Sequence, residues 1–221
     1  MNNTISAVIY DMDGVLIDSE PLWHKAEILS FATVGVSLTQ QMCLQTTGLR
    51  IDEVVEYWFA RYPWKEVSQK QVEERIWKSI IQLVKDHGKA KVGVIESLTF
   101  FKMNGYDIGL ASTSAMVLID VVLQKLGIQN FFSVVHSAEF EEFGKPHPGV
   151  YLTTANKMKV APRACIAIED SINGMVAAKA AKMKCIGVPE DVLFGDKRLG
   201  IADCIIPSLL DIDTNLLESL S

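Results

Sequence analysis

The first apolar segment of the chain, residues 5–10, ends in two acidic residues, Asp11 and Asp13. The segment is short and contains β-branched and aromatic residues, which is typical of a buried strand. Side chains two residues apart on an extended chain point the same way, so both carboxylates can converge beyond the strand end. Unpaired buried charges are costly, so we expect a compensating group nearby. One carboxylate can then act as a nucleophile while the other transfers protons.

Gly14 follows the acidic pair and allows the backbone to approach a ligand closely. The simpler interpretation of an isolated Asp-x-Asp-Gly motif is a solvated turn after a strand. The choice between the two therefore depends on the residues downstream.

Length and charge limit the classes of partner. The 221 residues, 49% of them hydrophobic, can form one core, or one core with a small accessory lobe. The formal charge of -6 gives no general attraction to nucleic acid or to anionic membranes, so we expect neither as a partner. A bound phosphate group must then be held by a local feature such as a metal ion, a lysine or a helix N-terminus.

Cysteine usage and hydropathy indicate the compartment. The four cysteines form no CxxC pair, which favours free thiols in a reducing compartment over a metal site. No secretory signal is evident, and no apolar stretch approaches the roughly 20 residues of a membrane helix. We expect a cytoplasmic protein. The oligomeric state cannot be read from the sequence, and a monomer is the working expectation.

Strand-like and helical patterns alternate in most of the chain. Further strands are expected at 107–111, 133–136, 165–168, 185–188 and, more weakly, 204–206, with helices at 115–126, 149–158 and 172–181. This alternation predicts an α/β fold with a Rossmann-like, mainly parallel sheet and helices on both faces. Ligands of such sheets bind beyond the carboxyl ends of the strands.

Residues 18–87 break the alternation. Asp18 or Ser19 with Pro21 signals a helix start, and helical spacing continues at 22–34, 51–62 and 68–84 without an intervening strand. We therefore predict an all-helical cap domain at 18–87, inserted into a core domain made of 1–17 and 88–221. All four tryptophans lie in the cap, and we expect most of them to form its own core.

Two strand ends carry groups that suit phosphate. Ser112 and Thr113 follow an apolar strand, where a hydroxyl and free backbone N–H groups can cradle an anion. Lys145 lies in a Gly-Lys-Pro-His-Pro loop whose prolines restrict its course, so this cation could neutralise a developing phosphoryl charge. Considered separately, Ser112 would be a helix cap and Lys145 a solvated surface lysine.

A third strand end supplies ligands for a metal ion. Ile166 to Ile168 is followed by Glu169 and Asp170, and Asp170 with Asp11 offers hard oxygen ligands suited to Mg²⁺. Neighbouring residues on a strand point to opposite faces, so Glu169 is expected to steady the site or to bind through water. A cation between the carboxylates would remove their mutual repulsion.

The order of these motifs resembles the four-part signature of the haloacid-dehalogenase-like (HAD) superfamily. The resemblance covers the whole chain. It implies that Asp11 attacks phosphorus and forms an aspartyl phosphate, and that Asp13 protonates the leaving alkoxide and then activates water. It implies that Ser112, Thr113 and Lys145 grip the phosphoryl group.

The same resemblance implies a Mg²⁺ ion held by Asp11, the backbone carbonyl of Asp13 and Asp170, with Glu169 assisting. The helical insertion is similar to the family's mobile cap, which closes to exclude water.

Branches of the superfamily differ at single positions. Dehalogenases lack the second aspartate, so Asp13 disfavours that branch. β-Phosphoglucomutases usually carry a histidine where this chain has Trp23; His24 is one residue away and is expected to point elsewhere on the helix. A hydrolase is therefore favoured over a mutase.

Two motifs in the cap are similar to those of bacterial phosphatases of 2-deoxyglucose 6-phosphate and related hexose or hexitol phosphates. They are Glu20-Pro21-Leu22-Trp23 and Gly48-Leu49-Arg50. That likeness implies a small phosphorylated sugar or sugar alcohol as the substrate, with Arg50 and Glu20 facing its polyol end. For Arg50 a surface position at a helix start fits equally well. The alternatives are a β-phosphoglucomutase-type mutase and, less favoured, a phosphoglycolate-type phosphatase.

Two readings from other functional classes are disfavoured. A bacterial receiver domain also combines acids, a lysine and Mg²⁺, but it places its acidic pair before the phosphorylated aspartate and lacks a large helical insertion. A catalytically inactive scaffold on the same fold would not need the intact set of Asp11, Asp13, Lys145 and Asp170.

Overall fold

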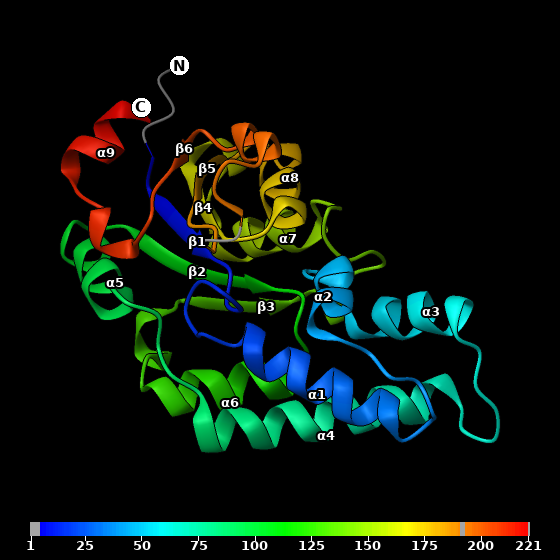
Figure 1. Cartoon of the computed structure of the whole chain (residues 1–221). Coiled ribbons are helices and arrows are strands. Elements are labelled where there is room, and N and C mark those ends of the chain that lie inside the picture. The colour runs from blue at the N-terminus through cyan, green and yellow to red at the C-terminus, as the bar shows by residue number, and fades with distance from the viewer. Residues whose placement is uncertain (1–4, 191–192, 221) are drawn as a thin grey trace.

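The computed structural model describes residues 5–190 and 193–220. The strands in this part of the chain are β1 (Ala7–Tyr10), β2 (Asp107–Ser112), β3 (Val134–Ser137), β4 (Cys165–Glu169), β5 (Lys184–Gly187) and β6 (Cys204–Ile205). They form one sheet in the order β3-β2-β1-β4-β5-β6, and each neighbouring pair is parallel (Figure 1). Because the strand order reverses at β1, the ends of β1 and β4 form the switch point where such sheets bind ligands.

The side chains of β1 alternate between the two faces of the sheet. Val8 and Tyr10 belong to one hydrophobic cluster, and Ala7 and Ile9 belong to the other. The first cluster contains residues of α5 (Val94–Met103), α6 (Met116–Leu126) and α9 (Thr214–Ser219), and the second contains residues of α7 (Gly149–Met158) and α8 (Ile172–Ala180). Both faces of the sheet are therefore covered, as the nearly continuous apolar strands require.

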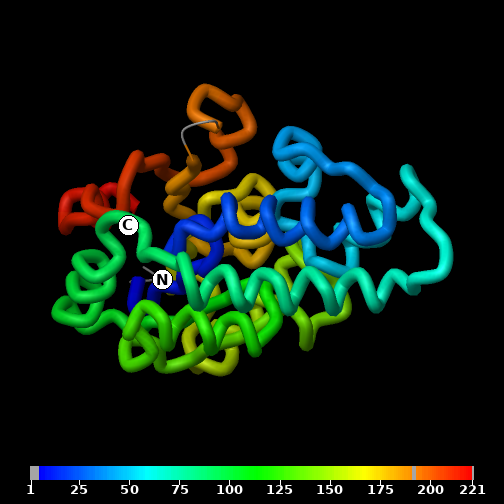
Figure 2. The backbone as a smooth tube through the Cα atoms, turned by 60° about the horizontal axis from the view of Figure 1, so that its bottom comes forward, coloured from blue at the N-terminus to red at the C-terminus, as the bar shows by residue number. Residues whose placement is uncertain are grey.

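The chain between β1 and α5 forms α1 (Glu20–Ala32), α2 (Gln40–Cys43), α3 (Ile51–Arg61) and α4 (Gln69–His87). These helices lie together to one side of the sheet, and the long α4 packs on α1 and α3 and also on α6 (Figures 1 and 2). Two linkers join them to the core. The linkers run side by side, since Asp18 N–H donates to Lys89 O at 3.0 Å and Lys91 N–H donates to Leu16 O at 3.1 Å.

The predicted parallel sheet, the helices on both faces and the strand-free helical insertion are confirmed. The exact division at residues 18 and 87 stays a prediction. Some predicted strand bounds were wrong by one residue. The strand expected at 133–136 is β3 at Val134–Ser137, and the one expected at 185–188 is β5 at Lys184–Gly187. Helix α5 was not predicted: its N-cap is Gly93 in the left-handed region, so no capping side chain marks its start.

The expectations on membrane and thiol chemistry can also be compared with the structure. Among residues 5–190 and 193–220, no helix combines the length and the apolar character that a membrane crossing needs. All four cysteines are free; Cys43, Cys165 and Cys185 are buried, and Cys204 is half-buried.

Candidate active site

The site is a cavity between the carboxyl ends of the strands and the helical insertion. The core contributes Asp11, Asp13, Gly14, Thr113, Ser114, Lys145, Asp170 and Ser171 to its lining. The insertion contributes Ser19, Glu20, Trp23, His24, Glu27, Cys43, Thr46, Thr47, Gly48, Leu49, Ile51, Val54 and Trp77. Acidic, hydroxyl and lysine side chains from four separate segments of the core therefore meet, as the strand ends predicted.

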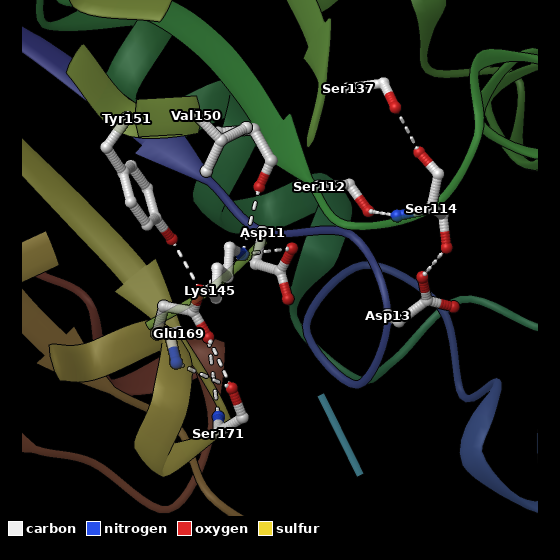
Figure 3. A network of polar contacts seen from close by, with 12 residues as sticks. Asp11, Asp13, Ser112, Ser114, Ser137, Lys145, Val150, Tyr151, Glu169 and Ser171 are labelled. Atoms are coloured by element: carbon white, nitrogen blue, oxygen red, sulfur yellow. Dashed lines mark hydrogen bonds and ion pairs between the residues drawn. The ribbon is translucent and has the colours of Figure 1, made fainter. Parts of the chain in front are cut away.

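Lys145 is a buried cation at the centre of the acidic groups. Its Nζ lies 2.8 Å from Asp11 Oδ1 and 2.6 Å from Glu169 Oε1, and it donates to Ala111 O at 3.2 Å. Burial favours the neutral amine, but Asp11 and Glu169 outweigh it and raise the pKa of Lys145 above its usual range. Lys145 is therefore charged and points into the site, not toward solvent (Figure 3).

Glu169 holds Lys145 from the side away from the cavity. Its side chain is completely buried, and its Oε1 also accepts from Tyr151 Oη at 2.6 Å. Its Oε2 accepts from Ser171 Oγ at 3.3 Å. A Cβ at Gly174 would lie 2.0 Å from this carboxyl group, so Glu169 fits only because that position is glycine. These contacts agree with the expectation that Glu169 steadies the site; Tyr151 had no sequence signal.

Asp11, Glu169 and Asp170 form a carboxylate cluster with oxygens within 4.8 Å of one another. Burial is the main factor that raises the pKa of Asp11 to about 7, while Lys145 opposes the shift. Burial, followed by the charges of Glu169 and Asp11, raises the pKa of Asp170 well above its usual range. The cluster thus holds more negative charge than the single nearby lysine balances, and a divalent cation fits this donor set.

Gly14 makes the approach of Asp170 possible. Its φ is +74°, and a Cβ there would lie 1.9 Å from Asp170 Oδ2. The approach of a ligand expected at Gly14 stays a prediction; the group that approaches Gly14 in this structure is the carboxylate of Asp170, which directly follows β4.

Asp13 is held by three donors, one from the linker after β1, one from α1 and one from the turn after β2. Its Oδ1 accepts from Ser19 Oγ at 2.6 Å and from Trp23 Nε1 at 2.8 Å, and its Oδ2 accepts from Ser114 Oγ at 2.6 Å. Ser19 is the N-cap residue of α1, yet its hydroxyl makes no capping bond. The bond from Ser19 to Asp13 was not predicted, because a serine before a helix is expected to cap it.

The turn expected to bind phosphate presents Thr113 and Ser114 to the cavity, but not Ser112. Ser112 is fully buried, and its Oγ accepts from Ser114 N–H at 3.0 Å. Thr113 and Ser114 line the cavity, and Ser114 is held in turn by Ser137, whose Oγ donates to Ser114 O at 2.6 Å. The three-residue turn lies beside Asp11 and Asp13 as expected (Figure 3), but Ser114 was not predicted.

Glu20 lies on the cap side of the cavity as predicted. Thr47 Oγ1 donates to its Oε1 at 3.5 Å. Burial is the largest factor that raises the pKa of Glu20 to about 7, followed by the neighbouring Glu190.

Arg50 is not among the residues that line the cavity, and its contact with the substrate stays a prediction. It is the N-cap of α3, where its Nε and Nη2 donate to Asp52 and its Nη1 donates to Glu141 O at 3.2 Å. The guanidinium of Arg50 is thus bonded to the carboxylate of Asp52 within the insertion. Its bond to Glu141 O connects the insertion to the core. This agrees with the alternative of a helix-start position.

The tryptophans divide between core and cavity. Trp58 and Trp64 are buried in the insertion, whereas Trp23 and Trp77 line the cavity with their ring centroids 5.6 Å apart. His24 also lines the cavity, so the expectation that it points elsewhere is wrong. Neighbouring positions on α1 both reach the site because the cavity wraps around that face of the helix.

A family model of the haloacid dehalogenase-like hydrolases matches residues 8–188. The chain belongs to this family. Hexitol phosphatase B of Escherichia coli strain K12 is 43% identical over 209 residues, which cover 94% of each chain. The phosphorylated carbohydrates phosphatase of Thermotoga maritima is 28% identical over 182 residues, 82% of this chain and 84% of that protein.

Among solved structures, β-phosphoglucomutase of Clostridium difficile is similar with a TM-score of 0.84 and 26% identity, over 97% of this chain and 96% of that one. The resemblance found from the four motifs is therefore confirmed at the level of family and fold. Receiver domains belong to a different family, which removes that alternative.

Proposed function

We propose that this HAD hydrolase is a Mg²⁺-dependent phosphomonoesterase of small sugar or sugar-alcohol phosphates. The observation that carries the proposal is the meeting of Asp11, Lys145 and Asp170 at the switch point of the sheet, beneath a cavity closed by the helical insertion. The relatives named for hexitol and carbohydrate phosphates support the substrate class.

Asp11 is the nucleophile in this proposal. One of its carboxylate oxygens bonds to phosphorus while the bond from phosphorus to the ester oxygen breaks. Lys145, 2.8 Å from Asp11, offsets the charge of the phosphoryl oxygens. The turn after β2, in which Thr113 and Ser114 line the cavity, offers hydroxyl and backbone donors to the same oxygens, and Ser112 holds this turn from within.

Asp13 transfers the protons. In its acid form it protonates the departing alkoxide, and as a carboxylate it then takes a proton from the water that attacks the aspartyl phosphate. This releases inorganic phosphate and restores Asp11. Ser19, Trp23 and Ser114 hold the carboxyl group in place for both steps.

The donor set suits Mg²⁺, which proteins of this family generally use. Asp11 and Asp170 would hold the ion, with the Asp13 carbonyl completing the ligand set and Glu169 assisting from behind. When bound, Mg²⁺ supplies charge neutralisation at the phosphoryl group. The space left by Gly14 next to Asp170 supports this arrangement.

Hydrolysis is favoured over phosphoryl transfer between sugar hydroxyls. Asp13 excludes the dehalogenase chemistry in this proposal, because a dehalogenase has no alkoxide to protonate. Trp23, which stands where β-phosphoglucomutases usually have histidine, only donates a hydrogen bond and cannot exchange a proton at neutral pH. A mutase remains the second candidate, since the β-phosphoglucomutase fold is so similar.

Turnover of a panel of phosphate esters tests the proposal. We expect Mg²⁺-dependent release of phosphate from hexitol and hexose phosphates, and a loss of more than about 1,000-fold in Asp11→Asn without loss of the fold. Most of the activity surviving in Asp11→Asn would refute the covalent route. Conversion of a sugar 1-phosphate to its 6-phosphate without phosphate release would favour the mutase. A cytoplasmic location and a monomeric state stay predictions from the sequence.

A further inference from the structure

We infer that Glu27 and His24 form the subsite that binds the hydroxyl groups of the substrate remote from its phosphate. This inference rests on the proposed function and specifies which cap residues select the substrate. Both residues line the cavity and neither takes part in the proposed chemistry.

Helical geometry places these side chains in a row above the strand ends. Glu20, His24 and Glu27 stand at positions i, i+4 and i+7 of α1, which share one face of a helix. The rise of 1.5 Å per residue puts Glu27 about 10 Å along the axis from Glu20. The row therefore runs from the linker beside Asp13 into the insertion.

Glu27 carries an unused hydrogen-bond acceptor into the cavity. Its side chain is 6% exposed, yet its Oε2 has no hydrogen-bond partner among residues 5–190 and 193–220. Buried polar atoms in native proteins are almost always satisfied, and an exception at a cavity wall points to a ligand. The only neighbouring donor to the Glu27 carboxyl group in the described chain is the thiol of Cys43, which forms a weak hydrogen bond with it. Burial raises the pKa of this thiol to about 12, so it stays neutral.

His24 also carries a polar atom whose hydrogen-bonding capacity is unused. Its Nε2 is buried without a hydrogen-bond partner in the described chain and lies 3.5 Å from Glu20 Oε1. Burial lowers the pKa of His24, so the ring is neutral near pH 7 and can accept or donate one hydrogen bond.

A polyol fits these groups better than other ligands do. Each hydroxyl both donates and accepts, so neighbouring hydroxyls can donate to Glu27 and exchange a bond with His24. The apolar lining of Leu49, Ile51, Val54 and Trp77 leaves few alternatives for the hydroxyls, and it contacts the carbon chain of the sugar. An anionic group at this end, as in a phosphorylated acid, would be repelled by Glu27.

Comparison of two substrates in one variant tests the inference. D-glucitol 6-phosphate carries the hydroxyls, and phenyl phosphate has none. The assay is run at about pH 8, above the pKa of about 7 that burial gives Glu27, so that its carboxyl group is ionised. Hydrogen bonds to charged groups contribute about 1.5–3 kcal/mol, so at this pH we expect Glu27→Gln to lower the ratio of kcat/KM for glucitol 6-phosphate to that for phenyl phosphate by about 10- to 100-fold. The change should be mainly in KM. Glu56→Gln, an exposed cap position, is the matched control whose ratio should not change.

Two results for Glu27→Gln would contradict the inference. An equal loss on both substrates would assign Glu27 a structural role, and an unchanged ratio would remove it from the subsite. His24→Asn should lower the same ratio, and the parent should prefer glucitol 6-phosphate to phosphoglycolate. A parent that hydrolyses phenyl phosphate but no sugar or polyol phosphate would refute the proposed substrate class itself; a parent active on sugar phosphates with an unaltered ratio in Glu27→Gln would refute only the inference.

Discussion

The buried carboxyl group of Glu27 should make the stability of the protein depend on pH. Burial is the largest factor that raises the pKa of Glu27 from 4.5 to about 7, and Glu20 adds a repulsive charge. In the unfolded chain the group ionises near its usual pKa. Between these two values the folded protein retains a proton that the unfolded chain has lost.

The sign follows from proton linkage. Where the native state binds more protons than the unfolded state, the free energy of unfolding falls as pH rises. One pKa unit corresponds to about 1.4 kcal/mol, so the change at Glu27 amounts to about 3 kcal/mol. This contribution is fully present below pH 4.5 and is lost as the pH rises to about 7.

Glu27→Gln removes the titrating group and nearly preserves its shape. We expect the variant to gain about 3 kcal/mol relative to the parent between pH 4.5 and pH 8, with the gain complete just above pH 7. Urea unfolding followed by tryptophan fluorescence and circular dichroism measures this difference at each pH. The difference between variant and parent cancels the titration of the other groups.

Glu56→Gln supplies the control, because it removes a carboxylate from an exposed position of α3 in the same insertion. A variant-minus-parent difference that stays constant with pH for Glu27→Gln would refute the reasoning. A smaller gain that is complete well below pH 7 would show that the pKa of Glu27 lies nearer to that of a solvated carboxyl group.

Three further predictions concern the core of the site. Gly14→Ala should lower kcat by about 100-fold or more and weaken Mg²⁺ activation, because its Cβ would displace Asp170; Mg²⁺ titration of activity measures both, and normal activation would contradict the packing. Trp23→Phe should lower kcat by about tenfold through loss of the bond to Asp13, with a change in the pH–rate profile; an unaltered profile would show that the indole N–H is dispensable. EDTA should abolish turnover, and added Mg²⁺ should raise the Tm of the parent but not that of Asp170→Ala; equal shifts in both would place the ion elsewhere.

The meeting of polar groups at the strand ends was predictable because it follows from sheet geometry. A strand that ends in Asp11 must bring that carboxylate to the same edge of the parallel sheet as the residues after β2 and β4. The alternation of Val8 and Tyr10 with Ala7 and Ile9 defines two buried faces and hence the helices that cover them. Lys145 needed more than this, since only the tertiary fold decides that its loop turns inward to Asp11 and Glu169.

Contacts that depend on competition between neighbours were not predictable. Arg50 could have reached a ligand, but Asp52, two residues away, accepts its guanidinium. Ser19 could have capped α1, but Asp13 accepts its hydroxyl. In both cases two partners are possible from the sequence. Which partner is bonded depends on distances in the folded chain, and these cannot be derived from the spacing of residues.

The row on α1 is a different case, because the sequence contains a signal for it. In an ordinary amphipathic helix the polar residues face solvent, so Glu20, His24 and Glu27 read as a solvated stripe. The same stretch is followed by Leu29, which is exposed, while Glu27 is buried. Polar spacing of i, i+4 and i+7 beside apolar residues on the outer face indicates a helix whose polar side faces a cavity. Where such an arrangement directly follows a strand end like that of Asp11, we would predict from the sequence that this side of the cap faces the substrate.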